Sequence, residues 1–392
     1  KTGSKSMGKD QRKYRVGVIG VGRQGSHHAR AYALHPRCEV VAGADTDAEN
    51  LELFCARFGA RGYGTCEEMF DREDIDISAP VLPVRANMDA VIASARAGVK
   101  LISCEKPLTA RLADADRMVE ESRRRGIPFA AGLVSKNRPH FWQALEMIRS
   151  GEIGRVHDIN IYDGCGQGGC HGPNLARHFA EFSTVEWVTG WVSGDAFSDY
   201  EEGYEEGETG FGEIGGHIRF ANGIDCFCHF RHPWKGVEVV GTAGMIFNDN
   251  PSNPDLHLWK ARDGGGVQGL ADLGEVQGLF PVNPSSTNPD GSRVRDDEGW
   301  IAATDGMIAT VQAIVDTLDR GAPLRLTTGE DLQQALEISI AMRESARRGG
   351  APVALPLEDR SLQLFPQKSR WYYKKEVHGV EWYREAIRQI VQ

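Results

Sequence analysis

The stretch that reads VGVIGVGRQG over residues 16–25 decides the fold of the N-terminal part of this chain. Its β-branched run ends at Gly20 and predicts a short buried strand, and residues 26–34 predict a helix. The G-x-G-x-x-G pattern between them allows a tight turn, close approach of a pyrophosphate to the backbone, and close packing of helix on strand. The N-terminus of the helix then presents N–H groups to the phosphate charge. Strand, glycine turn and helix in this order predict a dinucleotide site.

An acidic residue completes the predicted cofactor site. Asp45 follows the next predicted strand, residues 39–44. A carboxylate there accepts hydrogen bonds from both ribose hydroxyls and repels a 2′-phosphate, which favours NAD over NADP. An aspartate that only caps a turn at the end of the strand is the alternative. The cofactor contacts expected in the glycine turn itself are Gly20, Gly22, Arg23, Gln24 and Gly25.

The pattern of strands and helices divides the chain into two domains. Up to residue 136, predicted strands such as 75–82 and 100–104 alternate with helices, which indicates an α/β domain with a doubly wound parallel sheet, a Rossmann fold. From residue 137 to 360 the strands follow one another, and Asn222-Gly223 predicts a hairpin turn. We therefore expect a second, α+β domain with a large, mostly antiparallel open sheet.

The remaining segments are expected to be tails and loops. Residues 1–13 predict a disordered tail or a remnant of an expression vector, and residues 248–299 predict long loops because they are rich in Asn, Pro, Gly and Asp. Residues 361–392 predict an aromatic helical tail that docks either on its own chain or on a partner subunit.

Composition limits the classes of function. The 392 residues carry a formal net charge of −10, which argues against nucleic acid or a membrane surface as a partner because both are polyanions. No apolar run is long enough to span a bilayer. Eight cysteines in a chain of this length predict a reduced, cytoplasmic protein rather than a disulfide framework.

A second motif stands where the predicted strand at residues 100–104 ends. Cys104-Glu105-Lys106-Pro107 lies at the carboxyl edge of the predicted sheet, where ligands bind in open α/β folds. This EKP sequence behind a G-x-G-x-x-G turn resembles the glucose–fructose oxidoreductase/inositol dehydrogenase (Gfo/Idh/MocA) family. The resemblance extends over about residues 14–356, and further landmarks occur in the family's order: Pro83, Asn87, Gly132, Arg138, the G-x-I-G turn at 151–154 and the G-T-x-G turn at 241–244.

The resemblance implies roles for several of these residues. In the family the lysine of the EKP motif, here Lys106, lies between substrate and nicotinamide and assists proton transfer, and the glutamate, here Glu105, orients it. A surface lysine paired with Glu105 is the alternative. Pro83 and Asn87 fall in the loop on the cofactor side, and Arg138 falls at the start of the second domain, as a contact to substrate oxygens.

The second-domain motif departs from the family pattern D-x-x-x-H-x-x-D. Here residues 174–181 read NLARHFAE, and the spacing would place Asn174, His178 and Glu181 on one helical face. The resemblance implies that His178 is the general base and that Glu181 holds substrate hydroxyls. Asn174 replaces the aspartate that commonly pairs with the histidine, and we expect it to hold a neighbouring substrate oxygen. A satisfied core histidine is the alternative for His178.

The glycine-rich segment 164–172 comes directly before this helix. It could wrap the substrate, with Gln167 and His171 as polar contacts, or it could be a solvent loop. The patterns Cys165-x4-Cys170-His171 and Cys226-x-Cys228-His229 lack the paired spacing of structural zinc sites, so we expect no metal.

The sequence therefore predicts an NAD-dependent oxidoreductase that acts on the secondary alcohol or ketone of a sugar, polyol or glycoside. The first alternative is a glycosidase or lyase that uses tightly bound NAD⁺ through transient oxidation and elimination. The second is a non-catalytic NAD-binding regulator. The resemblance also implies a homodimer or homotetramer formed through the open sheet of the second domain.

Overall fold

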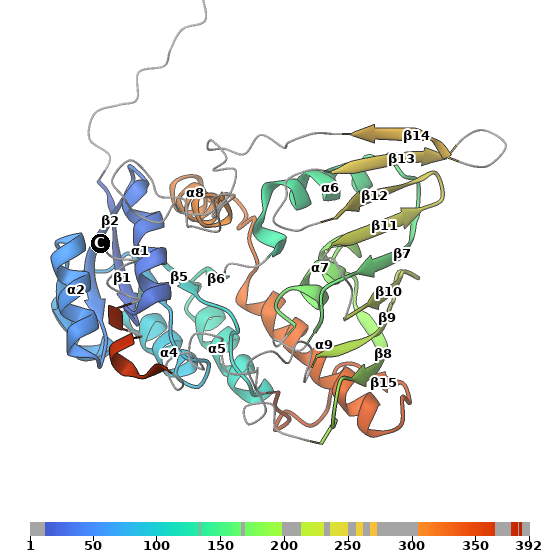
Figure 1. Cartoon of the computed structure of the whole chain (residues 1–392). Coiled ribbons are helices and arrows are strands. Elements are labelled where there is room, and N and C mark those ends of the chain that lie inside the picture. Colours follow the sequence, from blue (N-terminus) through green and yellow to red (C-terminus); the bar gives the residue numbers. More distant parts are fainter. Residues whose placement is uncertain are drawn as a thin grey trace, which may run out of the picture.

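The structure, a computed structural model, describes residues 12–132, 135–165, 169–197, 213–230, 236–249, 256–261, 267–272, 305–364, 378–382 and 384–385. Two sheets organise the described residues, one at the left and one at the right of Figure 1. A Rossmann sheet followed by a large mixed sheet is the fold class predicted from the sequence, which is thereby confirmed.

The first domain alternates strands and helices. Its elements are β1 (Tyr14–Ile19), α1 (Arg23–Leu34), β2 (Cys38–Ala44), α2 (Ala48–Phe58), β3 (Arg61–Tyr63), α3 (Cys66–Arg72), β4 (Ile77–Pro80), α4 (Asn87–Ala97), β5 (Leu101–Cys104), α5 (Leu112–Arg124) and β6 (Phe129–Ala131). All its neighbouring strands pair in parallel, in the order β3-β2-β1-β4-β5-β6. The strand order reverses between β1 and β4, so a crevice for ligands is expected at the carboxyl ends of these strands. The sequence did not predict β3 and α3, because such short elements carry little periodicity.

The second domain is built on the larger sheet. Its elements before the last two long helices are η1 (Ser135–Asn137), α6 (Pro139–Arg149), β7 (Val156–Ile161), α7 (Gly172–Phe179), β8 (Val185–Val192), β9 (Ile214–Phe220), β10 (Asp225–Cys228), β11 (Val237–Gly241), β12 (Gly244–Asn248), β13 (His257–Ala261) and β14 (Val267–Asp272). With β15 (Val353–Ala354), the sheet has the order β14-β13-β12-β11-β7-β10-β9-β8-β15. Only β7 and β10 pair in parallel among its described strands, so the mostly antiparallel character is confirmed.

Two local predictions for this sheet have opposite outcomes. The hairpin at Asn222-Gly223 is confirmed, because β9 and β10 pair antiparallel around it. The prediction of loops throughout residues 248–299 is wrong for β13 and β14, which extend the sheet from β12. Turn-forming residues surround these two short strands in the sequence, and pairing with β12 outweighs that local preference.

The last two long helices join the domains. α8 (Asp305–Arg320) packs on α1, and its Val311 and Ile314 share a buried cluster with Val16 of β1. α9 (Gly329–Arg347) packs on both β8 and α5. The prediction that residues 137–360 form one continuous second domain is therefore wrong for α8. The chain returns to the first domain because α8 covers apolar surface there.

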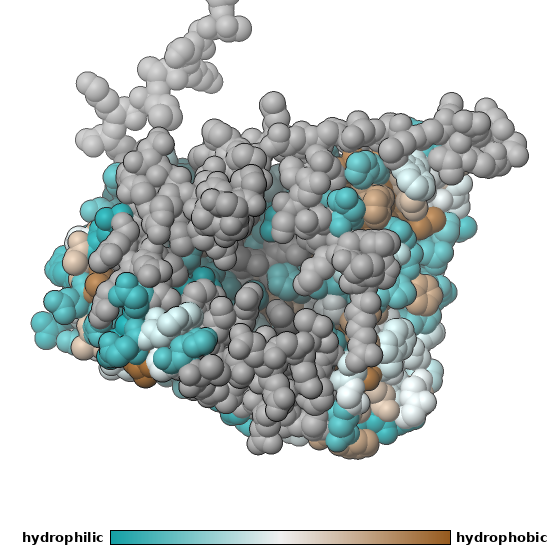
Figure 2. Space-filling model, viewed as in Figure 1, coloured by the Kyte–Doolittle hydropathy of each residue, from teal (hydrophilic) through white to brown (hydrophobic). Residues whose placement is uncertain are grey.

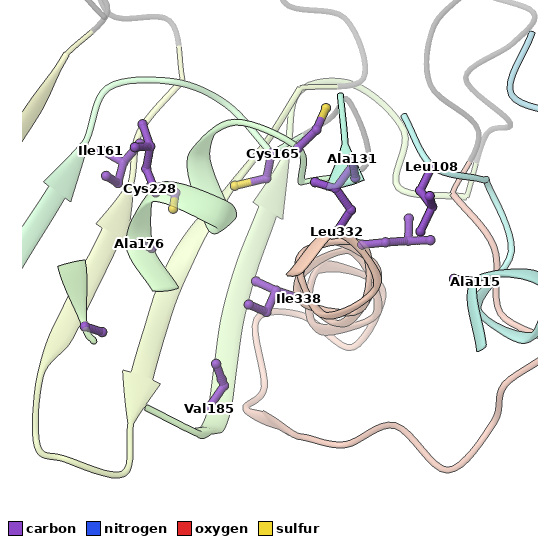
Figure 3. Packing of buried hydrophobic residues seen from close by; sticks show 14 of the residues in the cluster. Leu108, Ala115, Ala131, Ile161, Cys165, Ala176, Val185, Cys228, Leu332 and Ile338 are labelled. Atoms are coloured by element: carbon purple, nitrogen blue, oxygen red, sulfur yellow. The ribbon is translucent and has the colours of Figure 1, made fainter. Parts of the chain in front are cut away.

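A continuous hydrophobic core runs from one domain into the other (Figure 3). It begins at Ala115 of α5 and Ala131 of β6, passes Leu332 of α9, and reaches Ala176 of α7 and Cys228 of β10. Core packing at crystal-like density resists sliding of one domain on the other. The carboxyl edge of the first sheet is thereby held in a defined position relative to α7.

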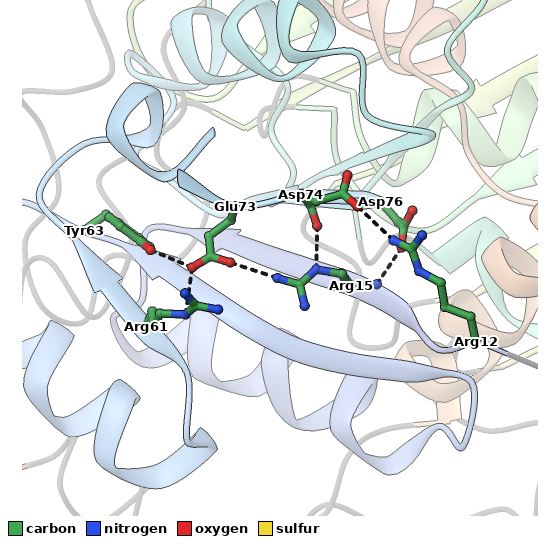
Figure 4. A network of polar contacts seen from close by, with 7 residues as sticks. All are labelled: Arg12, Arg15, Arg61, Tyr63, Glu73, Asp74 and Asp76. Atoms are coloured by element: carbon green, nitrogen blue, oxygen red, sulfur yellow. Dashed lines mark hydrogen bonds and ion pairs between the residues drawn. The ribbon is translucent and has the colours of Figure 1, made fainter. Parts of the chain in front are cut away.

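Polar contacts close the opposite, amino edge of the first sheet (Figure 4). The buried Glu73 carboxylate accepts hydrogen bonds from Arg15 at 2.8 Å and from the Tyr63 hydroxyl at 2.6 Å, and it pairs with Arg61 at 2.8 Å. These contacts tie β1 and β3 to the segment before β4. The polar contacts at the amino edge of this sheet thus have a structural role.

The two glycine-containing landmark turns of the second domain contact each other. The N–H of Ala243 donates to the carbonyl of Ile153 at 2.9 Å, and the N–H of Thr242 donates to the carbonyl of Arg155 at 3.0 Å. A Cβ on Gly154 would lie 2.5 Å from the Thr242 hydroxyl. Their shared role is close backbone packing of the two turns.

On the face shown in Figure 2, hydrophilic residues prevail on the described surface and hydrophobic residues occur singly.

Candidate functional site

The glycine turn between β1 and α1 has the geometry of a phosphate cradle. Gly20 has a φ of +84°, and a Cβ on it would lie 2.3 Å from the Val81 carbonyl oxygen. A Cβ on Gly25 would lie 1.9 Å from the Gly20 carbonyl oxygen, so only glycine fits at either place. α1 begins at Arg23 without a side-chain cap on its first N–H groups. An uncapped helix start above a glycine turn fits a dinucleotide pyrophosphate.

Asp45 lies beside this turn. One carboxylate oxygen accepts a hydrogen bond from the Val21 N–H at 2.8 Å, and the other accepts one from the Asp47 N–H at 2.9 Å. Burial raises the pKa of Asp45, and these backbone bonds act in the opposite direction. The contacts are those of a turn-capping aspartate, and they also hold the carboxylate at the place where a ribose is expected. The ribose contact stays a prediction.

Residues of several elements hold the EKP motif in place. The Glu105 N–H donates to the Pro80 carbonyl at 2.8 Å, and its buried carboxylate lies 3.2 Å from Nε2 of His28 on α1. That distance suits an ion pair, although the ring is out of line for a hydrogen bond. The Asn87 amide donates to the Pro107 carbonyl at 3.0 Å, and its Oδ1 is buried without a partner. Asn87 thus holds the EKP turn and keeps one polar atom for a ligand.

Lys106 is half-buried and its backbone is packed against the end of β6. Gly132 has a φ of +56°, and a Cβ on it would lie 2.7 Å from the Cβ of Lys106. The Gly132 N–H donates to the Cys104 carbonyl at 2.6 Å, and the Gly132 carbonyl accepts from the Asn137 amide at 2.8 Å. Glycine at position 132 therefore lets the crossing between the domains pass directly beside the lysine.

Thr327 connects this crossing to α7. Its carbonyl accepts from the Ala131 N–H at 2.8 Å, its N–H donates to the Asn137 Oδ1 at 2.7 Å, and its hydroxyl accepts from the Asn174 amide at 2.9 Å. Asn174 is fully buried. Its amide ties α7 to the crossing, whereas its Oδ1 is buried without a partner, as that of Asn87 is. The predicted contact of Asn174 with a substrate oxygen stays a prediction.

The N-terminal part of α7 is tied through Thr327 to the crossing that packs on Lys106. Burial raises the pKa of the Cys170 thiol to about 11, and the positive charge of Lys106 is close enough to act in the opposite direction. The charges of Asp163 and Glu105 also reach this thiol. His171 follows Cys170 directly and is half-buried immediately before the first residue of the helix. His171, which the sequence assigned as a substrate contact, thus lies at the start of α7, the helix whose Asn174 is tied to the crossing beside Lys106. Its contact with substrate stays a prediction.

His178 lies at the other end of α7 and inside the protein. It is fully buried, and its Nε2–H donates to the Phe141 carbonyl at 2.9 Å. Its ring makes edge contacts with Trp142 and Phe182. Burial lowers its pKa to about 3, so the imidazole is neutral. Its Nδ1 is buried without a hydrogen-bond partner. The full burial of the ring and its bond to Phe141 favour the core histidine over the predicted general base.

Glu181 does not share a helical face with these residues. α7 ends at Phe179, and Glu181 adopts a φ of +54° in the turn that follows. Its exposed carboxylate lies 3.1 Å from Nε of Arg149. The predicted substrate contact at Glu181 is therefore contradicted, because the i+7 spacing requires a helix that has already ended.

The other predicted site residues have mixed outcomes. Arg23 and Gln24 are half-buried in the first turn of α1, Pro83 is exposed in the turn before α4, and Arg138 is half-buried at the N-cap of α6. Gln167 lies outside the described residues.

Among the residues that the structure describes, no three His, Cys, Asp or Glu side chains form a group that could hold a metal ion. The described helices include none with the length and apolar character required to cross a membrane.

A buried charge cluster that the sequence did not indicate anchors α7. The Asp331 carboxylate lies 2.5 Å from Lys136 and 2.8 Å from Arg177. Burial acts to raise the pKa of Asp331, but the two cations outweigh it and lower the pKa to about 2. Burial lowers the pKa of Lys136, which packs over the Phe182 ring at 4.6 Å. Residues so far apart in the chain carry no common local signal, so only the fold identifies them.

We expect the buried histidines to make the protein sensitive to mild acid. Burial lowers the pKa of His178 and of His140 to about 3, and an unfolded histidine titrates near about 6.5. The unfolded state therefore binds protons that the folded state excludes, and stability falls as the pH drops from about 6.5 toward about 3. At pH 5 each histidine should lower the free energy of unfolding by about 2 kcal/mol.

Urea unfolding at pH 7.5 and pH 5.0 measures this loss. His178→Leu should lose its share of the pH dependence, and the share of His140 should remain. A pH dependence that is identical in the variant and the unmodified protein would contradict the assignment.

Comparisons with known proteins agree with this geometry. Residues 14–133 match the family model described as "Oxidoreductase family, NAD-binding Rossmann fold". The chain is 30% identical over 148 residues to myo-inositol 2-dehydrogenase of Thermotoga maritima, covering 38% of this chain and 44% of that protein. It is 26% identical to the rhizopine catabolism protein MocA of Rhizobium meliloti, covering 45% and 58%. The aligned segments thus span about half the length of these curated relatives.

One solved structure extends the likeness of fold to the second domain. A levoglucosan dehydrogenase in complex with NADH and levoglucosan superimposes with a TM-score of 0.68, covering 88% of this chain and all of that one. The sequence identity is 20%, so this likeness concerns the fold.

Proposed function

This chain belongs to the Gfo/Idh/MocA family of oxidoreductases, and we propose that it transfers hydride between NAD and a secondary alcohol or ketone of a sugar, polyol or glycoside. The observation that carries the proposal is geometric. Lys106, at the carboxyl edge of the Rossmann sheet, lies beside the crossing at Gly132, and Asn137 and Thr327 tie that crossing to Asn174 of α7 in the second domain. A substrate placed there contacts both domains and lies next to the glycine turn.

The residues of the first domain fit NAD. The uncapped start of α1 at Arg23 and Gln24 suits the pyrophosphate, and Asp45 suits the ribose. The unpartnered Oδ1 of Asn87 and the EKP turn lie farther along the same edge, where the nicotinamide end of the cofactor is expected. Bound NAD supplies the hydride acceptor or donor.

The remaining chemistry is proton transfer, and His171 with Lys106 can perform it. A secondary alcohol that loses a hydride from carbon must lose the hydroxyl proton to a base in order to become a ketone. A neutral imidazole at His171 accepts that proton, and the Lys106 ammonium donates a hydrogen bond to the same oxygen. Reduction of a ketone uses the reverse transfers. Glu105, held near His28, balances the lysine charge.

The dehydrogenase is the proposal that the relatives favour. The inositol dehydrogenase and the levoglucosan dehydrogenase are named for oxidation of a polyol and of a sugar derivative. The comparisons lend no support to the redox-neutral glycosidase or lyase, or to the non-catalytic regulator. The oligomer and the cytoplasmic location stay predictions.

A screen of purified protein tests the function. Polyols, sugars and glycosides are supplied with NAD⁺, and the absorbance of NADH and the release of aglycone are followed together. We expect NADH to accumulate with at least one polyol or sugar. Aglycone release without NADH would select the glycosidase or lyase, and tight NAD binding without any turnover would select the regulator.

Removal of the charge at Asp45 should relax cofactor selection. Asp45→Asn keeps the shape of the side chain but removes the carboxylate charge that repels a 2′-phosphate. We expect the ratio of the NADP and NAD dissociation constants to fall about tenfold, which corresponds to about 1.4 kcal/mol. Titration of each cofactor measures it. An unchanged ratio would leave Asp45 with the turn-capping role alone.

A further inference from the structure

The described part of the C-terminal tail docks on its own chain. Trp382 and Arg384 are half-buried, whereas His378, Glu381 and Glu385 are exposed. Nε of Arg384 lies 3.0 Å from a Glu49 carboxylate oxygen of α2, and its Nη1 donates to Glu381 at 2.9 Å. Of the two docking partners that the sequence left open, these contacts favour the chain's own body. Figure 1 shows the segment in red next to α2.

The place of docking is the carboxyl edge of the first sheet. Glu49 lies in the first turn of α2, which begins directly after the carboxyl end of β2. The Asp47 side chain caps α2 and accepts from the Glu49 N–H at 3.1 Å, and the Asp47 N–H in turn donates to Asp45. One short segment therefore carries both the predicted ribose contact and the anchor of the tail.

We propose that residues 378–382 and 384–385 form an outer wall of the site for the adenosine half of NAD, positioned by the pair between Arg384 and Glu49. The inference rests on the proposed function only for the place of NAD on the first domain. Because Trp382 and Arg384 turn toward the body, the segment covers the start of α2 where the adenosine end of a dinucleotide lies. Its role is to retain the cofactor, and it takes no part in proton transfer.

Charge reversal tests the wall through direct binding of NAD and of ADP-ribose to the full chain. An ion pair that is partly open to solvent contributes little, whereas two like charges at the same place repel, so reversal is the sharper change. Arg384→Glu should raise the dissociation constants of both ligands at least threefold, because both carry adenosine. Glu49→Arg should do the same. The double variant Glu49→Arg with Arg384→Glu restores the pair with opposite polarity and should bring both constants within twofold of the unmodified protein.

Controls separate docking from other effects. Arg123→Glu breaks a more exposed arginine–glutamate pair, with Glu330, away from the carboxyl edge, and should leave NAD binding unchanged. In turnover assays Arg384→Glu should raise the KM for NAD and leave kcat unchanged at saturating NAD. Unchanged NAD binding in Arg384→Glu, or two weakened single variants that the double variant fails to restore, would overturn the wall. Because binding is measured directly, a failure of the oxidoreductase proposal would appear separately, as absent turnover with NAD bound.

Discussion

Lys106→Ala should abolish turnover while NAD still binds. The lysine emerges at the end of β5 beside the crossing to which α7 is tied, where it can donate a hydrogen bond to the oxygen that changes between alcohol and ketone. Loss of a hydrogen-bond donor to an oxygen that gains charge in the transition state costs about 10²–10³-fold in rate. We expect kcat to fall by at least that range, and the dissociation constant of NAD to change less than threefold because the glycine turn and Asp45 remain intact.

Lys100→Ala is the matched control. Lys100 is an exposed lysine that comes just before β5 and pairs with Asp76 at 2.8 Å, at the amino edge of the sheet. It should retain full kcat. Stopped-flow or steady-state assays with the substrate found in the screen, together with NAD titrations, provide the comparison. Full activity in Lys106→Ala would remove the lysine from the proposed chemistry.

His171→Gln and His178→Leu should separate chemistry from stability. His171 directly precedes α7, and a glutamine there keeps a polar side chain that cannot take up a proton at neutral pH. We expect kcat to fall about 10²–10⁴-fold and its dependence on pH to lose the limb that reports the base. NAD affinity and thermal stability should stay close to those of the unmodified protein.

His178→Leu should show the reverse pattern. Its buried ring donates to the Phe141 carbonyl, and leucine would leave that acceptor unpaired, at a cost of about 1–3 kcal/mol of folding free energy. We expect a lower unfolding midpoint and a kcat within threefold of the unmodified protein at a temperature where both are folded. A normal rate in His171→Gln with a dead but well-folded His178→Leu would return the role of base to His178.

The first domain could be predicted well because its signals are local. The run before Gly20, the G-x-G-x-x-G turn, the acid at the end of β2 and the EKP motif each lie within a few residues, and parallel strands alternate regularly with helices. Most predicted strands and helices of this domain begin and end within a few residues of the observed ones. The short elements β3 and α3 were not predicted, because so few residues carry little hydrophobic periodicity.

The roles of residues in the second domain were harder to predict, because they depend on contacts between segments that lie far apart in the sequence. A histidine spacing alone could not indicate that α7 ends at Phe179, nor that Trp142 and Phe182 enclose the ring of His178. The sequence of the 174–181 motif is compatible with a catalytic helix face and with a buried one. Only the packing of α6 against α7 distinguishes these two interpretations. His171 carried the weaker signal, a polar residue in a glycine-rich loop, and yet it is the histidine that lies half-buried at the start of α7.

The sequence by itself determined that this protein has an NAD-binding Rossmann domain, because glycine turns, strand ends and their acidic or basic residues act over distances that neighbouring residues span. The tertiary structure decided which side chains of the second domain are buried, and that α8 and the tail return to the first domain. Those outcomes depend on burial and on the pairing of charges such as Lys136 with Asp331, which exists only after distant segments have packed together.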